Sequence, residues 1–216
     1  MPKIKNVFKW VNWVENRIYP ASPVPSWYQA VEWIWSSATQ YINTSYTPNV
    51  NTEIETELSW WSSQTNRWVF FWVTSNDNWA DWILWRIYDS STTIFNPWFC
   101  NSAYWECQIS TSVDTFHKVI LKKNYCTLDW TAWTLTTTWT PYQNNIYLFC
   151  WDNGWSAWRH STCKFKSFKI SESWTLVKNF VPCYRISDGV IWMYETIWKQ
   201  FYVNSWSWTF TKWQNV

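Results

Sequence analysis

Three alternating glutamates are the residues of this chain whose spacing best fits catalysis. Glu53, Glu55 and Glu57 lie within the stretch TEIETELS, residues 52–59. Strict alternation is typical of a half-buried β-strand, in which every second side chain lies on the same face. Two carboxylates on one face can act as nucleophile and general acid in a retaining glycoside hydrolase. The spacing therefore permits a glycosidase, provided that these side chains line a cleft.

Two loops rich in Asp and Asn, residues 76–81 and 152–154, are candidates for ligand binding. Their carboxylate and amide oxygens are the donors that calcium prefers, so a calcium ion is expected, if one binds, at Asp77, Asp81 and Asp152. The alternative is that these residues only form turns. The candidate ligand-binding residues are Asn76, Asp77, Asp81, Asp152, Asn153, Arg159 and His160.

The histidines and cysteines do not form a recognisable catalytic or zinc motif. His117 and His160 are the only histidines, and neither has a serine or cysteine partner in such a motif. His117 is therefore predicted to be a surface residue or a hydrogen-bonded core residue. The cysteines lack C-x-x-C spacing, which argues against zinc, and most are predicted to be buried thiols. Cys100 and Cys107 flank a loop and are the candidate disulfide.

Charge and hydropathy exclude several classes of partner. The net charge is +2, which predicts no nucleic-acid binding and no strong attraction to an anionic membrane. No apolar run is long enough to span a membrane. The first residues contain no continuous apolar segment, so no secretory signal is expected.

Short strand-like runs separated by turn residues fill the chain, and the one helical candidate is a single turn near residues 193–197. This pattern predicts an all-β, two-sheet antiparallel sandwich of the jelly-roll type. The expected strands are residues 28–34, 39–42, 52–59, 68–74, 83–88, 115–122, 125–128, 134–138, 146–150, 163–171 and 176–182. The expected core is Ile54, Val69, Phe71, Val119, Leu121, Ile146, Leu148, Phe168, Ile170 and Phe180.

A proline-rich segment divides the chain into two unequal parts. Residues 1–26 form a short basic arm and a linker with three prolines, and residues 27–216 form the main domain. Strands are possible in the arm at residues 4–9 and 14–19. The arm has too little apolar mass for a core of its own, so we expect it to attach to another chain.

Tryptophan stands where glycine is expected. The chain has 26 Trp and 2 Gly, whereas globular proteins contain about 7% glycine. Turns with positive φ require glycine because it has no Cβ. The pattern indicates a gene in which UGA encodes glycine but was read as tryptophan, with Trp33 as the best candidate for an authentic tryptophan in an apolar strand. The positions that suggest this are Trp79, Trp82, Trp130, Trp151, Trp206 and Trp208 in turns, and Trp60-Trp61 in a Ser-rich segment.

Four segments carry a resemblance to a known family. Residues 31–44, VEWIWSSATQYINT, resemble the opening strand of LamG-like, concanavalin A-like jelly-roll domains. Residues 164–170 (KFKSFKI), 177–182 (VKNFVP) and 191–210 resemble the closing strands of that family. Trp192, Trp206 and Trp208 stand at its glycine positions, while Asn179 and Glu195 stand where it usually has Asp. The resemblance covers residues 28–213, and residues 59–116 match only in pattern.

The resemblance implies a non-enzymatic recognition domain. Such domains bind carbohydrate or a host surface in phage virion proteins, often associated with the tail, and in bacterial cell-surface proteins. The expected partners are a glycan or cell-surface ligand and, through the arm, other virion or surface-protein chains. Two alternatives are a glycosidase that uses Glu53, Glu55 and Glu57, and a structural decoration domain without a ligand.

Overall fold

The described part of the chain is built from β-strands. The computed structural model describes residues 22–37, 39–60, 68–73, 83–87, 94–99, 109–135, 144–152, 157–158, 160–205 and 209–216. Within these ranges every regular element is a strand and every strand pair is antiparallel, which confirms the all-β prediction. Consequently these ranges hold no helix that could cross a membrane. Residues 1–21, with the two strands predicted in the arm, lie outside them.

The larger sheet has eleven strands. Eight of them form the continuous order β11-β10-β9-β4-β15-β16-β17-β18, while β1 pairs with β16, and β2 pairs with both β15 and β19. The strands of this sheet are β1 (Tyr28–Ala30), β2 (Ile34–Ser36), β4 (Thr52–Trp60), β9 (His117–Lys122), β10 (Tyr125–Leu128), β11 (Thr131–Thr134), β15 (Cys163–Glu172), β16 (Thr175–Arg185), β17 (Ile191–Glu195), β18 (Gln200–Val203) and β19 (Thr211–Lys212).

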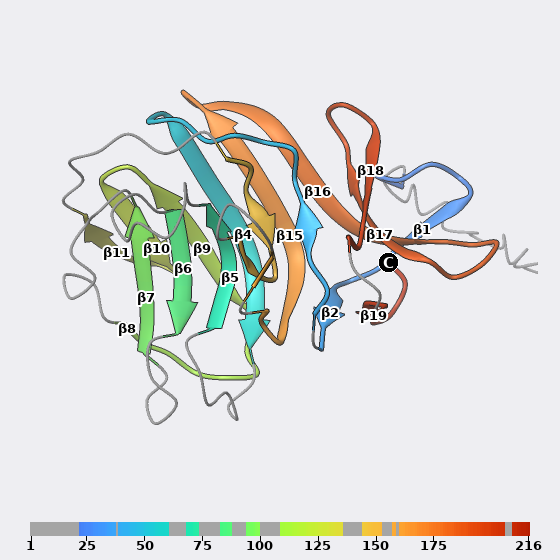
Figure 1. The fold of residues 1–216 in the computed structure, drawn as a ribbon, viewed down its shortest axis with the longest axis horizontal. Helices are drawn as coiled ribbons and strands as arrows, with labels where there is room; N and C mark the ends of the chain where they lie inside the picture. Colours follow the sequence, from blue (N-terminus) through green and yellow to red (C-terminus); the bar gives the residue numbers. More distant parts are fainter. Residues whose placement is uncertain are drawn as a thin grey trace, which may run out of the picture.

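A second sheet of six strands has the order β3-β12-β5-β6-β7-β8, and β13 pairs with β14 separately. In Figure 1 the strands β5, β6 and β7 form a layer beside the long strands of the larger sheet. These strands are β3 (Ile42–Asn43), β5 (Trp68–Val73), β6 (Ile83–Ile87), β7 (Ile94–Phe99), β8 (Ile109–Ser110), β12 (Tyr147–Leu148), β13 (Trp151–Asp152) and β14 (Ala157–Trp158).

One hydrophobic core joins the two sheets, as in a β-sandwich. Phe71 of β5 meets Phe168 of β15 with ring centroids 5.3 Å apart, and Phe70 meets Trp60 of β4 at 5.3 Å. Each buried ring of this kind contributes about 1.5–3 kcal/mol. Nine of the predicted core residues are buried in this cluster: Ile54, Phe71, Val119, Leu121, Ile146, Leu148, Phe168, Ile170 and Phe180. The side chain of the tenth, Val69, lies outside the described part.

Alternation predicted the long strands because one face of each is buried. In β4 the side chains of Ile54, Thr56 and Leu58 are buried in turn, while the intervening glutamates are partly exposed. The alternation fails where the pairing shifts. A β-bulge between Val69 and Phe71 allows Phe70 and Phe71, adjacent in sequence, both to be buried.

The predicted strand at residues 28–34 is instead two strands with different partners. Tyr28–Ala30 pairs with β16, whereas Ile34–Ser36 pairs with β15 and β19. The chain changes neighbours between them, so Trp33 lies outside any strand rather than inside one, and it stacks on Trp213 with a centroid distance of 5.3 Å.

The helical turn predicted at residues 193–197 is wrong. Met193 lies within strand β17, where its side chain is buried in the core, and the turn begins only after Glu195. A single helical turn, and a strand end followed by a turn, can show similar spacings of apolar residues in the sequence. Here the pairing of β17 with β16 and β18 makes these residues a strand.

Five other strand predictions are wrong at their ends, one of them that of β16, which continues to Arg185 instead of ending at Pro182. Strand β3 begins at Ile42, three residues later than predicted, and β11 ends at Thr134, where the predicted strand began. Strand β12 covers only Tyr147–Leu148 of the predicted 146–150, and Trp151–Asp152, taken as a turn, forms the short strand β13. The predicted strand at 115–122 begins two residues later, at His117.

The end of the proline-rich segment packs on the outer face of the larger sheet. Val24 is buried in a second, smaller cluster with Ala30, Cys183 and Tyr194. The amide of Tyr28 donates a 2.9 Å hydrogen bond to the carbonyl of Pro25, which forms the turn into β1. Residues 24–30 therefore contribute to the main domain as well as leading into it.

Two tight hairpin turns contain exposed tryptophans. Ser173 and Trp174 form the two-residue turn between β15 and β16 with φ values of 45° and 72°, and the indole of Trp174 is 85% exposed. Trp130 follows Asp129, which has φ 53°, in the turn between β10 and β11, and its indole is 95% exposed. Turns with two positive φ values strongly favour glycine at the second position.

The other described tryptophans vary in burial. Trp60, predicted to belong to a flexible segment, is instead the last residue of β4 and is buried. Trp192, assigned to a glycine position, lies in β17 and packs edge-on against Tyr28 and Phe201 at 6.3 and 5.5 Å. Trp79, Trp82, Trp206 and Trp208 lie outside the described residues, and of Trp151 only the backbone is described.

The described cysteines are buried thiols, as predicted. Cys126, Cys150, Cys163 and Cys183 all lie in the interior. Burial raises the pKa of the Cys183 thiol to about 12 and also raises the pKa of Cys163, so both remain protonated at neutral pH. Cys100 and Cys107, the candidate disulfide, lie outside the described residues.

Candidate functional site

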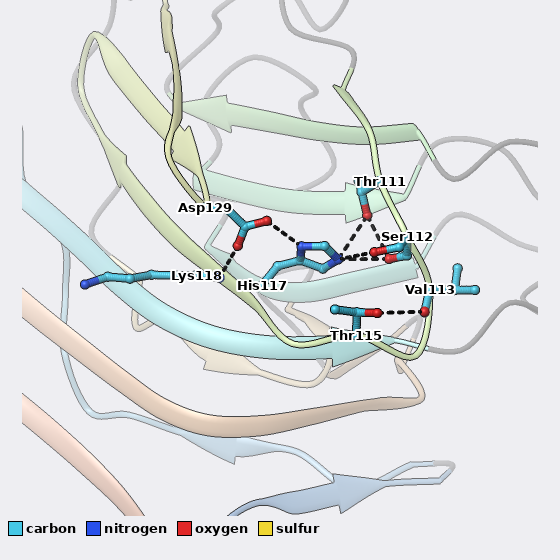
Figure 2. A network of polar contacts seen from close by, with 7 residues as sticks. All are labelled: Thr111, Ser112, Val113, Thr115, His117, Lys118 and Asp129. Carbon is cyan, nitrogen blue, oxygen red and sulfur yellow. Dashed lines mark hydrogen bonds and ion pairs between the residues drawn. The ribbon is translucent and has the colours of Figure 1, made fainter.

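His117 is the centre of a polar network at the start of β9 (Figure 2). Its Nδ1 lies 2.8 Å from Oδ2 of Asp129, and its Nε2 lies 2.9 Å from the carbonyl oxygen of Ser112. The hydroxyls of Ser112 and Thr111 each lie 3.3 Å from Nε2. The other carboxylate oxygen of Asp129 accepts a 3.0 Å hydrogen bond from the backbone amide of Lys118. A serine, a histidine and an aspartate are thus brought together in the order used by hydrolase triads.

The hydrogen bonds give this network a structural role instead. The Ser112 carbonyl oxygen only accepts hydrogen bonds, and it lies closer to Nε2, at 2.9 Å, than the Ser112 hydroxyl does, at 3.3 Å. Nε2 is therefore engaged by the loop backbone, while Nδ1 faces the Asp129 carboxylate. The ring is also buried against Trp60 at a centroid distance of 4.9 Å. His117 therefore ties the loop at residues 111–116 to the β10–β11 turn, which agrees with the prediction of a hydrogen-bonded core residue.

The three alternating glutamates lie on one face of β4, as predicted, and each is paired with a lysine from a neighbouring strand. Lys122 of β9 lies 3.2 Å from Glu53, and Lys166 of β15 lies 3.1 Å from Glu57. Glu55 has two partners, Lys169 at 2.8 Å and Lys118 at 3.2 Å. This face points away from the shared core. Of the three glutamates, only Glu53 lines the groove described below, whereas a glycosidase would need them to share a cleft.

The two lysines beside Glu55 determine its protonation. Partial burial would raise the pKa of this carboxyl group, but hydrogen bonds from Lys169 and Lys118 outweigh that effect and hold the pKa below its ordinary value. Glu55 is therefore an anion at neutral pH and cannot serve as the protonated general acid that a glycosidase needs.

Glu55→Gln is expected to make the free energy of unfolding depend less on pH in the acidic range. Because the folded-state pKa is lowered, the stabilisation by Glu55 is present above its ordinary value of 4.5 and is lost as the pH falls through the folded-state value. At neutral pH the substitution should cost less than about 1 kcal/mol, because the pair is partly exposed. Urea unfolding between pH 3 and pH 7 measures both effects, and identical pH profiles for the variant and the parent chain would contradict the assignment.

A groove lies at one end of the larger sheet, where three turns meet at the upper left of Figure 1. It encloses about 460 Å³, which is within the range of small-ligand sites. The turn before β4, the β9–β10 turn and the β15–β16 turn form its walls. The lining side chains that can form hydrogen bonds to a ligand include Asn51, Glu53, Lys122, Lys123, Asn124 and Ser173.

Hydrogen bonds hold the turn before β4 in place beside the groove. Tyr46 donates from its hydroxyl to Glu172 at 2.5 Å, and that hydroxyl lies 3.0 Å from the hydroxyl of Thr52. Burial and the neighbouring Glu172 raise the pKa of Tyr46, so the phenol stays protonated. The amide of Ser173 donates to the carbonyl of Asn51 at 3.3 Å and links two of the three walls. No local sequence pattern indicates this groove, because its residues come from turns that are distant along the chain.

Most of the loop residues predicted to bind a ligand lie outside the part of the chain that the structure describes. Asn76, Asp77, Asp81, Asn153 and Arg159 lie outside the described residues. The backbone of Asp152 lies in β13, and His160 packs beside Tyr41 with ring centroids 5.9 Å apart. Within the described ranges no group of three or more His, Cys, Asp or Glu side chains is placed to hold a metal ion.

Comparison with known proteins adds no family assignment. No protein-family model and no curated protein sequence matches this chain.

Proposed function

We propose that this chain is a non-enzymatic recognition domain that binds carbohydrate or a host surface, in a phage virion or a cell-surface protein. The observation that carries the proposal is the sheet-end groove, where polar side chains from three turns surround a volume suited to a sugar residue. Amides, hydroxyls and charged groups on a fixed scaffold are the chemistry by which proteins bind polyhydroxylated ligands. The two-sheet antiparallel architecture and the resemblance of residues 31–44, 164–170, 177–182 and 191–210 support a LamG-like jelly roll.

The arm and the calcium ion belong to the same proposal. Residues 1–21 would attach the domain to another chain of the particle or surface. Calcium would bind at Asp77, Asp81 and Asp152. Hard oxygen donors from Asp side chains suit this ion.

A glycan array tests the proposed function. The purified chain is applied to immobilised neutral and anionic oligosaccharides, once with calcium and once with a chelator. Saturable binding to a defined set is expected, and a loss in chelator would support the calcium site. Failure to bind any glycan or a preparation of host surface would favour the ligand-free decoration domain. Cleavage of a bound oligosaccharide would contradict the non-enzymatic assignment and favour the glycosidase.

A further inference from the structure

The groove contains one ion pair whose two partners both line it. Glu53 and Lys122 face each other across β4 and β9 with Nζ and Oε2 3.2 Å apart. A carboxylate only accepts hydrogen bonds and an ammonium group only donates them. Side by side, the pair offers one acceptor and one donor to a ligand, which is the complement of two neighbouring hydroxyl groups.

We propose that the Glu53–Lys122 pair binds vicinal hydroxyls of a neutral sugar residue in the sheet-end groove. This inference rests on the proposed function and assigns both the place and the class of ligand. Asn51 and Asn124, on the walls formed by two different turns, add amide groups that donate and accept. Hydrogen bonds to charged side chains are about twice as strong as those between neutral groups, so the pair should dominate the affinity.

The position of the pair is fixed before a ligand arrives. Glu53 is the second residue of β4, and its register opposite Lys122 is set by the β4–β9 ladder. The Nζ atom of Lys122 lies 4.9 Å from the ring centroid of Tyr125 and 4.5 Å from that of Trp174. Because Glu53 and the ring of Tyr125 already hold the lysine, little side-chain entropy remains to be lost on binding.

The charge of the groove favours a neutral ligand over an anionic one. The positive charge of Lys122 is already matched by Glu53, and an incoming carboxylate would approach the Glu53 anion. Lys123 also lines the groove, but its side chain is exposed, where solvent and salt screen its attraction. A neutral hexose or N-acetylhexosamine satisfies the pair without introducing a further charge.

The indole of Trp174 is not required by this mode of binding. It covers one side of Lys122 but contributes no hydrogen bond to the set formed by Glu53, Lys122, Asn51 and Asn124. A glycine at position 174 would leave the polar set in place and open the groove further. The affinity is therefore expected to survive Trp174→Gly.

The test compares substitutions in two ion pairs on the same face of the larger sheet. One pair lines the groove, and the other, which serves as the control, does not. Glu53→Gln and Lys122→Met alter the groove, while Glu57→Gln and Lys166→Met alter the pair 3.1 Å apart that does not line it. Each variant is titrated calorimetrically with the neutral oligosaccharide that binds most strongly on the array, and with a uronic-acid oligosaccharide of equal length. Thermal unfolding confirms that every variant is folded.

Each outcome has a defined meaning. Weakening of about tenfold or more in both groove variants, with both control variants unchanged, supports the inference. Unchanged binding in the groove variants overturns it but leaves the recognition function intact, because the ligand then binds elsewhere. Preference for the uronic acid overturns the neutral-ligand assignment. Loss of binding in Trp174→Gly but not in Trp130→Gly would show that the indole, not the ion pair, binds the ligand.

Discussion

Glu195→Ala is expected to lower the free energy of unfolding by about 2–4 kcal/mol, the largest effect of any single substitution considered for this chain. The buried carboxylate accepts three backbone hydrogen bonds at the end of β17. Oε1 accepts from the amides of Asn179 and Ile197 at 2.9 and 2.8 Å, and Oε2 accepts from the amide of Trp198 at 2.8 Å. Alanine would leave these donors without an acceptor and release the turn into β18.

Two further variants sharpen this prediction. Glu195→Gln keeps an oxygen for two of the three amides and should cost about half as much. Glu32→Gln removes a partly exposed partner of Lys166 and should cost less than about 1 kcal/mol. Urea unfolding monitored by tryptophan fluorescence measures all three. If Glu195→Ala were no more destabilising than Glu32→Gln, the three hydrogen bonds would not be stabilising the turn.

Trp174→Gly is expected to stabilise the chain by about 1 kcal/mol, even though it removes a large side chain. A residue with a Cβ in the left-handed region costs about 1–2 kcal/mol, while loss of an exposed cation–π contact with Lys122 costs about 0.5–1 kcal/mol. Trp174 has φ 72° and an 85% exposed indole, so little burial is lost. Trp130→Gly is the control, because Trp130 is equally exposed but only its neighbour Asp129 has a positive φ. Thermal unfolding of the two variants gives the comparison.

The same substitution bears on the proposal that glycine was encoded at most tryptophan positions. If UGA encodes glycine in the source of the gene, a chain with glycine at the exposed turn positions should be more soluble and should unfold cooperatively. Exposed indoles create apolar patches that promote aggregation. A mass spectrum of native material provides the direct measurement, since glycine is far lighter than tryptophan. A native mass equal to the 26.5 kDa of the written sequence would contradict the recoding proposal.

The described tryptophans differ in how well a glycine would fit in their place. Trp60 is buried between Phe70 and His117, where an indole fills space that a glycine would leave empty. By contrast, Trp130 and Trp174 extend from tight turns into solvent. Local composition alone did not separate these cases, because Trp60 has serines near it in sequence and apolar rings near it in space.

The elements that could be predicted from the sequence are the strands in which buried and exposed residues alternate regularly. The alternation in residues 52–59 correctly placed Glu53, Glu55 and Glu57 on the face opposite Ile54, and the hairpin ending in Tyr125–Leu128 was also correct. The break between Ala30 and Ile34 was missed because it depends on a change of partner strand. The backbone there bonds to residues near the end of the chain, as in the 2.9 Å hydrogen bond from the Glu32 amide to the Gln214 carbonyl. No local pattern reports such a contact.

The candidate site was missed for the same reason. The walls of the groove come from turns near residues 51, 123 and 173, which only the pairing of β9, β4 and β15 brings together. The network around His117 likewise joins Ser112 to Asp129 through a loop and a hairpin. Sequence reasoning singled out Glu53 only with Glu55 and Glu57, as the catalytic set of an alternative function, and did not predict its ion pair with Lys122.

The positions of the first and last strands determine how the domain would respond to mechanical tension. The side chain of Gln29 donates to the Val216 carbonyl at 2.8 Å, and the short strand β19 pairs with β2 (Figure 1). The two ends of the described chain therefore leave the sheet at the same place. A force applied between them would open these few contacts and would not shear the long β4–β15 ladder. The central strands that hold the groove would therefore remain unstrained while the two ends are pulled apart.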